Sequence, residues 1–470
     1  MKLAFLHYHL KPGGVTTVLR QQIRALRDDA QLLVISGETP PPDFPCKVVC
    51  IPGVGYTSPD RFPQQASRTA EEIRQTIRRY FHGPCDLLHI HNPLLAKNRL
   101  FLDIIQSLQQ SGMTLFLQVH DFAEDGRPLA FYGDTPYPGD CHYGVINTRD
   151  FNNLMKAGLS PNGLHLLPNC IDTFEGTAAA VRESHVLYPV RAIRRKNLGE
   201  ALLLSLYLPE GQSVFITQPP NSPADIPSYA GWKSFAVAHH LPVRFEMGRQ
   251  RPFPSLVASA TWVLTTSISE GFGFAFLEPW IAGKELKGRL LPDICQDFID
   301  NGITLPHLYD RIRLPMEWWG RQRILDRFAD CLASNRQAYG SLWPRPWEET
   351  CLSALQQGSR IDFGMLDEGL QMECLERICR DPKRRQELLV RNPSLAAMLT
   401  SNASFRTTIA QNQDRIISAY HPDRYREQLL QIYARILQGP VRHAIDRRRL
   451  LVAFLKPDRF SLLKWSACHG

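Results

Sequence analysis

The sequence predicts an α/β protein with two Rossmann-like, doubly wound domains that face a cleft, and a helical C-terminal extension. The first observation is a repeated pattern of a short apolar strand, a Gly, Pro or Asn loop and a helical stretch. The second is that a new set of such units begins near Ser184, after a short polar stretch. Alternating strands and helices build a parallel sheet with helices on both faces. Ligands of such sheets bind at the carboxyl ends of the strands.

The first domain is expected over residues 1–175. Residues 2–8 are apolar enough for a buried parallel strand, and residues 16–26 have helical spacing after a Lys-Pro-Gly-Gly loop. The same reasoning predicts further strands at 31–36, 86–91, 114–119 and 143–147, and a helix at 97–110. Residues 172–183 form a short, polar stretch that contains Ala and Gly, which is typical of an interdomain linker.

The second domain is expected over residues 184–420. Its predicted strands are 185–189, 213–218, 242–245 and 261–266, and its first helix is 197–208. After about Trp318 helical patterns dominate, and residues 284–412 receive no element in detail. A helix is predicted at 424–437 within a segment 421–438, and residues 439–470 form a basic amphipathic tail.

Composition excludes several classes of protein. The 470 residues are 44% hydrophobic and 21% charged, unlike disordered, collagen-like or coiled-coil chains. No run approaches the roughly 18 apolar residues of a membrane-spanning helix, and His7, His9 and Lys11 interrupt the apolar start too early for a signal peptide. Eleven cysteines without a Cys-x-x-Cys pair argue against a disulfide framework, so a reduced, cytoplasmic protein is expected.

The net charge of +8 is concentrated in the tail. Residues 439–470 hold seven Lys or Arg against two Asp, mixed with Leu, Phe and Trp. We therefore expect no nucleic-acid partner. The tail instead suggests peripheral contact with an anionic membrane surface, at the inner face of the membrane. Packing against the domains is the equal alternative.

Residues 269–280, SEGFGFAFLEPW, carry the most specific pattern. An apolar strand precedes them, Gly271 and Gly273 turn the chain, and a helix containing Glu278 follows. The glycines let backbone amides approach a ligand at a helix N-terminus. Carboxylates such as Glu270 accept hydrogen bonds from hydroxyl pairs, so the pattern suits a sugar.

These residues resemble the retaining glycosyltransferases of family 4, which have the two-Rossmann-domain GT-B fold. The signature of that family is Glu, seven residues and Glu, with a Gly-Phe-Gly core. The resemblance implies that Glu270 contacts the hydroxyls of the donor sugar and that Glu278 holds the nucleotide ribose. It also implies that Gly271, Phe272, Gly273 and Phe274 belong to the donor site.

A second match lies in residues 188–198, YPVRAIRRKNL. The family places an Arg and, five residues later, a Lys on the donor diphosphate, and Arg191 and Lys196 have that spacing. Fixed cations stabilise the charge that grows on a leaving phosphate. Asn197 stands where the family usually has Gly, and Arg194 and Arg195 are interpreted as solvated charges.

The resemblance extends to the first domain. Gly13 and Gly14 follow the first strand, where the family has a Gly-rich loop near the donor phosphate and the acceptor. His120 ends a strand where the family places a His near the reacting carbon. Residues 167–172, LPNCID, resemble a family Pro-Asn-Gly-x-Asp, with Cys170 in place of Gly. The segment 421–438 would cross back to the first domain.

The sequence does not predict a metal site. The pairs His7/His9 and His89/His91 share strand faces, but no acidic cluster completes a ligand set. No Asp-x-Asp occurs, the motif with which the other large fold of nucleotide-sugar transferases binds a divalent metal.

The resemblance to family 4 therefore implies a metal-independent, retaining hexosyltransferase without a cofactor. The donor would be a nucleotide diphosphate sugar such as UDP-glucose or GDP-mannose, and the acceptor a sugar, a phosphorylated small molecule or a lipid-linked glycan. Glu270, Arg191, Lys196 and His120 are the predicted catalytic residues. The alternatives are a nucleotide-sugar epimerase or phosphorylase of the same fold, or a non-catalytic sugar-nucleotide-binding protein. A dinucleotide oxidoreductase is disfavoured because no Gly-x-Gly-x-x-Gly follows the first strand.

Overall fold

A computed structural model describes residues 1–56, 64–172, 184–400 and 406–466. The chain divides into two compact units. Unit 1 comprises Met1–Cys170, Arg336–Pro344 and Tyr420–Leu455, and unit 2 comprises Ile171–Asn335, Arg345–Ala419 and Lys456–Gly470. Apart from Asp172, the predicted linker at 172–183 lies outside the described residues, as does the end of the predicted tail, 467–470.

Unit 1 contains a seven-stranded parallel sheet in the order β3-β2-β1-β4-β5-β6-β7. Its strands are apolar on both faces because helices cover both sides. They are β1 (Lys2–His7), β2 (Gln31–Ser36), β3 (Lys47–Cys50), β4 (Leu87–His91), β5 (Leu115–Val119), β6 (His142–Val145) and β7 (Leu164–Leu166).

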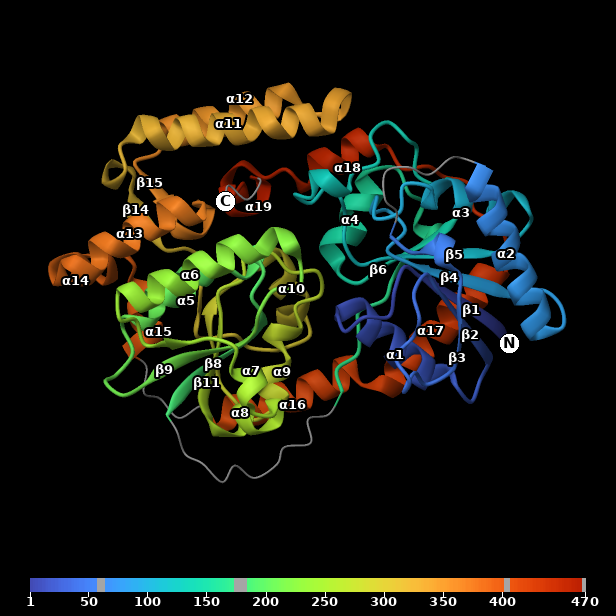
Figure 1. The fold of residues 1–470 in the computed structure, drawn as a ribbon, viewed down its shortest axis with the longest axis horizontal. Helices are drawn as coiled ribbons and strands as arrows, with labels where there is room; N and C mark the ends of the chain where they lie inside the picture. The colour runs from blue at the N-terminus through green and yellow to red at the C-terminus, as the bar shows by residue number, and fades with distance from the viewer. Residues whose placement is uncertain (57–63, 173–183, 401–405, 467–470) are drawn as a thin grey trace. The chain divides into compact units, whose positions relative to one another are not determined.

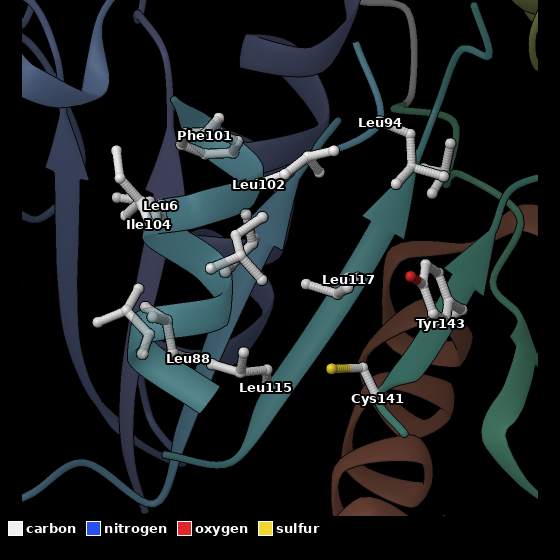
Figure 2. Close-up of a cluster of buried hydrophobic side chains, with 14 of the residues drawn as sticks. Leu6, Leu88, Leu94, Phe101, Leu102, Ile104, Leu115, Leu117, Cys141 and Tyr143 are labelled. Carbon is white, nitrogen blue, oxygen red and sulfur yellow. The ribbon is translucent and has the colours of Figure 1, made fainter. Parts of the chain in front are cut away.

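Helices from distant parts of the chain cover this sheet. On one face, α1 (Gly14–Leu26) packs beside α17 (Pro422–Leu437) (Figure 1). The buried residues of these two helices join Leu3 and Phe5 of β1. The other face carries α2 (Gln64–Phe81) and α3 (Phe101–Gln110). Figure 2 shows the apolar side chains of α3 against those of the strands. The remaining helices of unit 1 are α4 (Thr148–Lys156) and α18 (Arg447–Phe454).

Unit 2 contains a six-stranded parallel sheet in the order β10-β9-β8-β11-β12-β13. Its strands are β8 (His185–Arg191), β9 (Ser213–Gln218), β10 (Val243–Arg244), β11 (Ala260–Thr265), β12 (Leu286–Arg289) and β13 (Leu308–Tyr309). A separate antiparallel pair consists of β14 (Arg313–Pro315) and β15 (Arg360–Asp362). The two parallel α/β sheets and the helical C-terminal region confirm the predicted fold class.

The other helices follow in chain order. They are α5 (Leu198–Ser205), α6 (Ile226–Ala238), α7 (Met247–Gln250), α8 (Phe253–Ser259), α9 (Glu278–Ile281), α10 (Pro292–Asp300), α11 (Arg321–Tyr339), α12 (Arg345–Gln357), α13 (Glu368–Arg380), α14 (Pro382–Arg391), α15 (Pro393–Thr400), α16 (Arg406–Tyr420) and α19 (Leu462–Trp465). Within the described ranges, none of the helices is both long and apolar enough to cross a membrane.

The predicted tail is divided between the two units. Leu450 and Leu451 of α18 are buried in unit 1, where α18 packs against α4. Leu463 and Trp465 of α19 are buried in unit 2. The apolar side chains that suggested membrane contact are therefore used mainly in packing within the units.

Candidate functional site

The two motifs of unit 2 come together at the carboxyl edge of its sheet. β8 and β11 are neighbouring parallel strands, so the loops that follow them lie at the same edge. The Ile268 amide donates to the Arg195 carbonyl at 2.9 Å, and the Thr266 hydroxyl donates to the Lys196 carbonyl at 2.9 Å. The Tyr188 hydroxyl also donates to the Lys196 carbonyl. The backbone that carries Lys196 is thus held against the Glu motif.

Lys196 and Glu270 form an ion pair between the Lys196 Nζ and the Glu270 Oε1. Only 9% of Glu270 is exposed. Burial by itself would raise the pKa of the Glu270 carboxyl, but the charges of Lys196 and Arg195 outweigh it and hold that pKa below its usual value. Glu270 is therefore a carboxylate at neutral pH, and a carboxylate accepts hydrogen bonds from hydroxyl groups.

The Gly-rich turn has the backbone that its sequence predicts. Gly273 has a φ of 95°, and a Cβ there would lie 3.0 Å from the Ile294 Cγ2 and 3.0 Å from the Phe276 Cδ2. Phe272 is buried and its ring meets the Phe298 ring of α10 edge-on at 5.9 Å. The aromatic residues of the motif therefore anchor the turn in the core.

Glu278 begins α9, where the helix dipole favours a negative charge. Its side chain is exposed, yet surrounding protein atoms desolvate the carboxyl and raise its pKa, and the nearby Asp172 carboxylate raises it further. Lys196 acts in the opposite direction. The Lys196 ammonium therefore acts electrostatically on both Glu270 and Glu278.

Arg191 ends β8, and its guanidinium makes no hydrogen bond or ion pair with any part of the chain that the structure describes. Asn197, six residues after the end of β8, adopts the left-handed conformation with a φ of 53°. Glycine and asparagine tolerate this conformation best. Asn197 thus adopts a backbone angle that glycine would also adopt without strain.

The interpretation of Arg194 and Arg195 as solvated charges is wrong. The Arg194 side chain is only 11% exposed, and it forms an ion pair with Glu368 of α13 at 2.6 Å. Arg195 is half-buried, and its charge lowers the pKa of Glu270. The basic run RRK contains no local pattern that distinguishes the largely buried Arg194 and half-buried Arg195 from solvated charges.

The residues predicted in unit 1 lie at the carboxyl edge of its own sheet. α1 begins at Gly14, and Gly13 and Gly14 are exposed with no side chain capping the helix. His120 follows β5 and is buried, and its Nε2 lies 2.9 Å from the His91 Nδ1. The Asn92 side chain accepts a hydrogen bond from the His120 amide at 2.8 Å, which fixes the strand end.

His120 belongs to a buried group that we call the histidine cluster, consisting of His7, His89, His91 and His120. Burial lowers the pKa of His7 and of His89 to about 3 and that of His120 to about 4, and lowers the pKa of His91 as well. The imidazoles are therefore neutral at pH 7. Across the described ranges, the structure has no group of three or more His, Cys, Asp or Glu arranged to hold a metal ion.

Sequence reasoning missed a buried ionic network behind the loop. Arg289 of β12 pairs with Glu200 of α5 at 2.5 Å and with Asp362 of β15 at 2.7 Å. Glu200 also accepts from the Asn197 side chain at 2.8 Å and from the Tyr309 hydroxyl at 2.6 Å. A signal was present, because Glu200 is the one charged residue in the otherwise apolar stretch LGEALLL.

Comparisons with known proteins agree with this geometry. No family model matches the chain. A mannosylglucosyl-3-phosphoglycerate synthase of Petrotoga mobilis is 26% identical over 353 residues, which cover 66% of this chain and 68% of that protein. Two solved structures each match 92% of this chain and 98% of their own: a sucrose-phosphate synthase from Thermosynechococcus elongatus (TM-score 0.54, 14% identity) and HepE of Anabaena in complex with UDP-glucose (TM-score 0.55, 13% identity). This chain has the GT-B fold. At these identities the structural likeness concerns the fold and not the reaction.

Proposed function

We propose that the chain is a retaining glycosyltransferase of family 4 that moves a hexose from a nucleotide diphosphate sugar to an acceptor hydroxyl. The observation that carries the proposal is the contact between Lys196 and Glu270 at the carboxyl edge of the unit 2 sheet. Ligands of open α/β sheets bind at this edge. A cation suited to phosphate and a carboxylate suited to sugar hydroxyls are adjacent there.

The roles within unit 2 follow from charge. Arg191 and Lys196 bind the donor diphosphate, Glu270 and the amides from Gly271 to Phe274 bind the sugar, and Glu278 binds the ribose. Diphosphate binding draws the Lys196 ammonium from Glu270 toward the phosphate, and this frees the carboxylate for the sugar. The half-exposed Arg191, which has no protein partner in the described chain, keeps all its donors for the phosphate.

The proposed reaction breaks the bond between the sugar C1 and the phosphate oxygen and forms a bond from C1 to the acceptor oxygen on the same face. The proton of the acceptor hydroxyl passes to the leaving phosphate, so no separate general base is needed. Negative charge grows on that phosphate in the transition state, and Arg191 and Lys196 stabilise it without a metal. The resemblance to family 4 assigns to His120 a hydrogen bond to the donor sugar, and to Gly13 and Gly14 backbone amides for the donor phosphate.

The names of the relatives guide the choice of substrates. One solved neighbour holds UDP-glucose, and the name of the sequence relative describes a product with mannosyl, glucosyl and 3-phosphoglycerate groups. We therefore propose UDP-glucose and GDP-mannose as the donors to test first, and phosphorylated small molecules as the first acceptors. The proposed setting is the cytoplasm.

The test is a transfer assay with these two donors and a panel of acceptors, in which release of the nucleoside diphosphate is measured. We expect Lys196→Ala to lower turnover roughly 10²- to 10³-fold, by analogy with the loss of a preorganised charge donor. Glu278→Ala is expected to weaken donor binding. Lys233→Ala is the matched control, because Lys233 pairs with Glu246 elsewhere in unit 2 and is 45% exposed.

Near-normal turnover of folded Lys196→Ala would contradict the site assignment. Incubation with donor alone separates the alternatives, since a rearranged sugar would indicate an epimerase. Dependence on inorganic phosphate would indicate a phosphorylase. Tight binding of a nucleotide without turnover on any acceptor would indicate a non-catalytic binding protein.

A further inference from the structure

We propose that residues 456–466 clamp the loop between β8 and α5 through Arg194, which makes Arg194 a positioning residue for the donor diphosphate. The inference rests on the proposed function, because it assigns Lys196 of the same loop to the diphosphate. It assigns to residues 456–466 a role that the resemblance to family 4 does not imply.

The first step of the argument is the set of contacts made by the Arg194 guanidinium. Its Nε and Nη2 donate to the two Glu368 carboxylate oxygens at 2.6 and 2.8 Å. Its Nη1 donates to the Ser466 carbonyl at 2.6 Å, and Nη2 also reaches the Ser466 hydroxyl at 3.3 Å. Every nitrogen of the guanidinium is thus engaged by protein, so Arg194 acts through the loop and not on the phosphate.

The second step is that residues 456–466 are fixed independently of Arg194. The Ser461 hydroxyl donates to the Gly364 carbonyl at 2.8 Å, and the Asn335 side chain donates to the Trp465 carbonyl at 2.9 Å. The Trp465 ring stacks on the Phe460 ring at 5.3 Å, and both side chains are buried. The segment is therefore a firm support, and Ser466 is held at its end.

The third step is the path from Arg194 to Lys196. The two residues begin and end one tight turn, in which the Asn197 amide donates to the Arg194 carbonyl at 2.9 Å. Asp225 accepts from the Arg194 amide at 3.0 Å, and Thr266 holds the Lys196 carbonyl at the other end of the turn. Losing the guanidinium contacts loosens the first end of the turn, and the Lys196 ammonium then moves relative to Glu270. A misplacement of about 1 Å at a reacting group lowers rates by up to roughly 10²-fold.

The experiment combines hydrogen exchange with donor kinetics on the full chain. In the wild-type protein, UDP or GDP should slow amide exchange both in residues 194–198 and in residues 462–466, since coupling between two sites is reciprocal. In Arg194→Ala, exchange in both segments should speed up, and kcat/KM for the donor should fall roughly 10- to 100-fold. Arg194→Lys should rescue little, because lysine cannot reproduce the fork of hydrogen bonds.

The matched control is Arg311→Ala. Arg311 pairs with Asp458 of the same segment at 2.7 Å, with side chains 21% and 63% exposed, so its loss removes a contact of the segment other than the one to Arg194. This variant should leave both the exchange of residues 194–198 and the donor kinetics unchanged. If Arg194→Ala does not fold, Glu368→Gln replaces it as the test variant. This substitution removes the negative charge but keeps a hydrogen-bond acceptor. It should therefore speed amide exchange and lower kcat/KM for the donor by less than Arg194→Ala would.

The two proposals fail in different ways. If the wild-type protein binds neither nucleotide and transfers no sugar, the proposed function is wrong. If it binds and transfers, and the Arg194 and Glu368 variants loosen residues 462–466 without altering donor kinetics, the clamp is overturned. Equal effects of Arg311→Ala and Arg194→Ala would also overturn it, since the segment would then act only on general stability.

Discussion

Replacing Arg289 by Met tests whether the buried ionic network stabilises unit 2. Methionine fills similar volume but removes the charge and five hydrogen bonds, at 2.5 to 3.1 Å, to Glu200, Asp362 and the Asp310 carbonyl. Glu200 is fully buried and the Asp362 side chain is 8% exposed, so two carboxylates would remain with little access to water.

The expected loss follows from what each carboxylate keeps. Glu200 retains the Tyr309 hydroxyl and the Asn197 amide group, and Asp362 retains the Ile312 amide at 2.9 Å. These neutral donors cannot balance two adjacent negative charges. Breaking a buried pair by removing one partner costs about 3 to 5 kcal/mol of unfolding free energy. That is a large share of the stability of about 5 to 15 kcal/mol that holds most domains together.

Urea unfolding followed by tryptophan fluorescence measures this loss selectively. Seven of the eight tryptophans lie in unit 2, the exception being Trp343. The control is Arg323→Met, which breaks the pair of Arg323 with Glu373, at 2.6 Å with side chains 49% and 34% exposed. Surface pairs contribute about 0 to 1 kcal/mol. A loss below about 1 kcal/mol for Arg289→Met, equal to the control, would refute the reasoning.

Three further predictions concern the histidine cluster and two backbone positions. Because burial depresses the pKa values in the cluster, the unfolded chain binds protons that folded unit 1 does not bind as pH falls from about 6.5 toward 4. Each histidine should therefore lower the unfolding free energy by on the order of 1 kcal/mol at pH 5.5. Urea midpoints followed by circular dichroism should fall accordingly, and His89→Gln should weaken this pH dependence. Asn197→Ala should be about 1 kcal/mol less stable than Asn197→Gly, since both lose the side chain and only Ala is strained at a φ of 53°; equal melting curves would contradict this. Gly273→Ala should lower the unfolding free energy by about 1 to 3 kcal/mol and weaken donor binding, because the added Cβ is crowded. The control is Gly283→Ala, where φ is 69° and no atom lies within 4 Å of the added Cβ, so only the backbone strain should lower stability.

The sequence predicts those parts of the fold whose secondary structure is marked by a local pattern of apolar residues. The central strands β1, β2, β4, β8, β9 and β11 are runs of buried apolar residues, so their positions could be predicted within a few residues. Edge strands and polar buried strands lack that pattern. β12 reads LKGR, and its Arg289 is buried because Glu200 and Asp362, both far along the chain, neutralise its charge. No window of sequence contains those partners.

The same reasoning applies to the candidate site. The pairing of Lys196 with Glu270 could be anticipated because both follow strands of one predicted sheet. The inward turn of Arg194 could not, because its partners Glu368 and Ser466 come from regions with no pattern linking them to the loop. A charged residue is by default expected to face solvent, and a buried one is recognised only when its distant partners are known.

The division of the chain between the units has a consequence for its synthesis. The face of the unit 1 sheet that carries Leu3 and Phe5 is covered in part by Leu429 and Tyr433 of α17. Ribosomes add about 5 to 20 residues per second, so the gap between Cys170 and Leu437 corresponds to roughly 15 to 50 s of translation. Throughout that interval an apolar face of the first sheet lacks its final helix. Until α17 arrives, α1 covers only part of that face, so slower elongation lengthens the time during which the emerging chain can aggregate there.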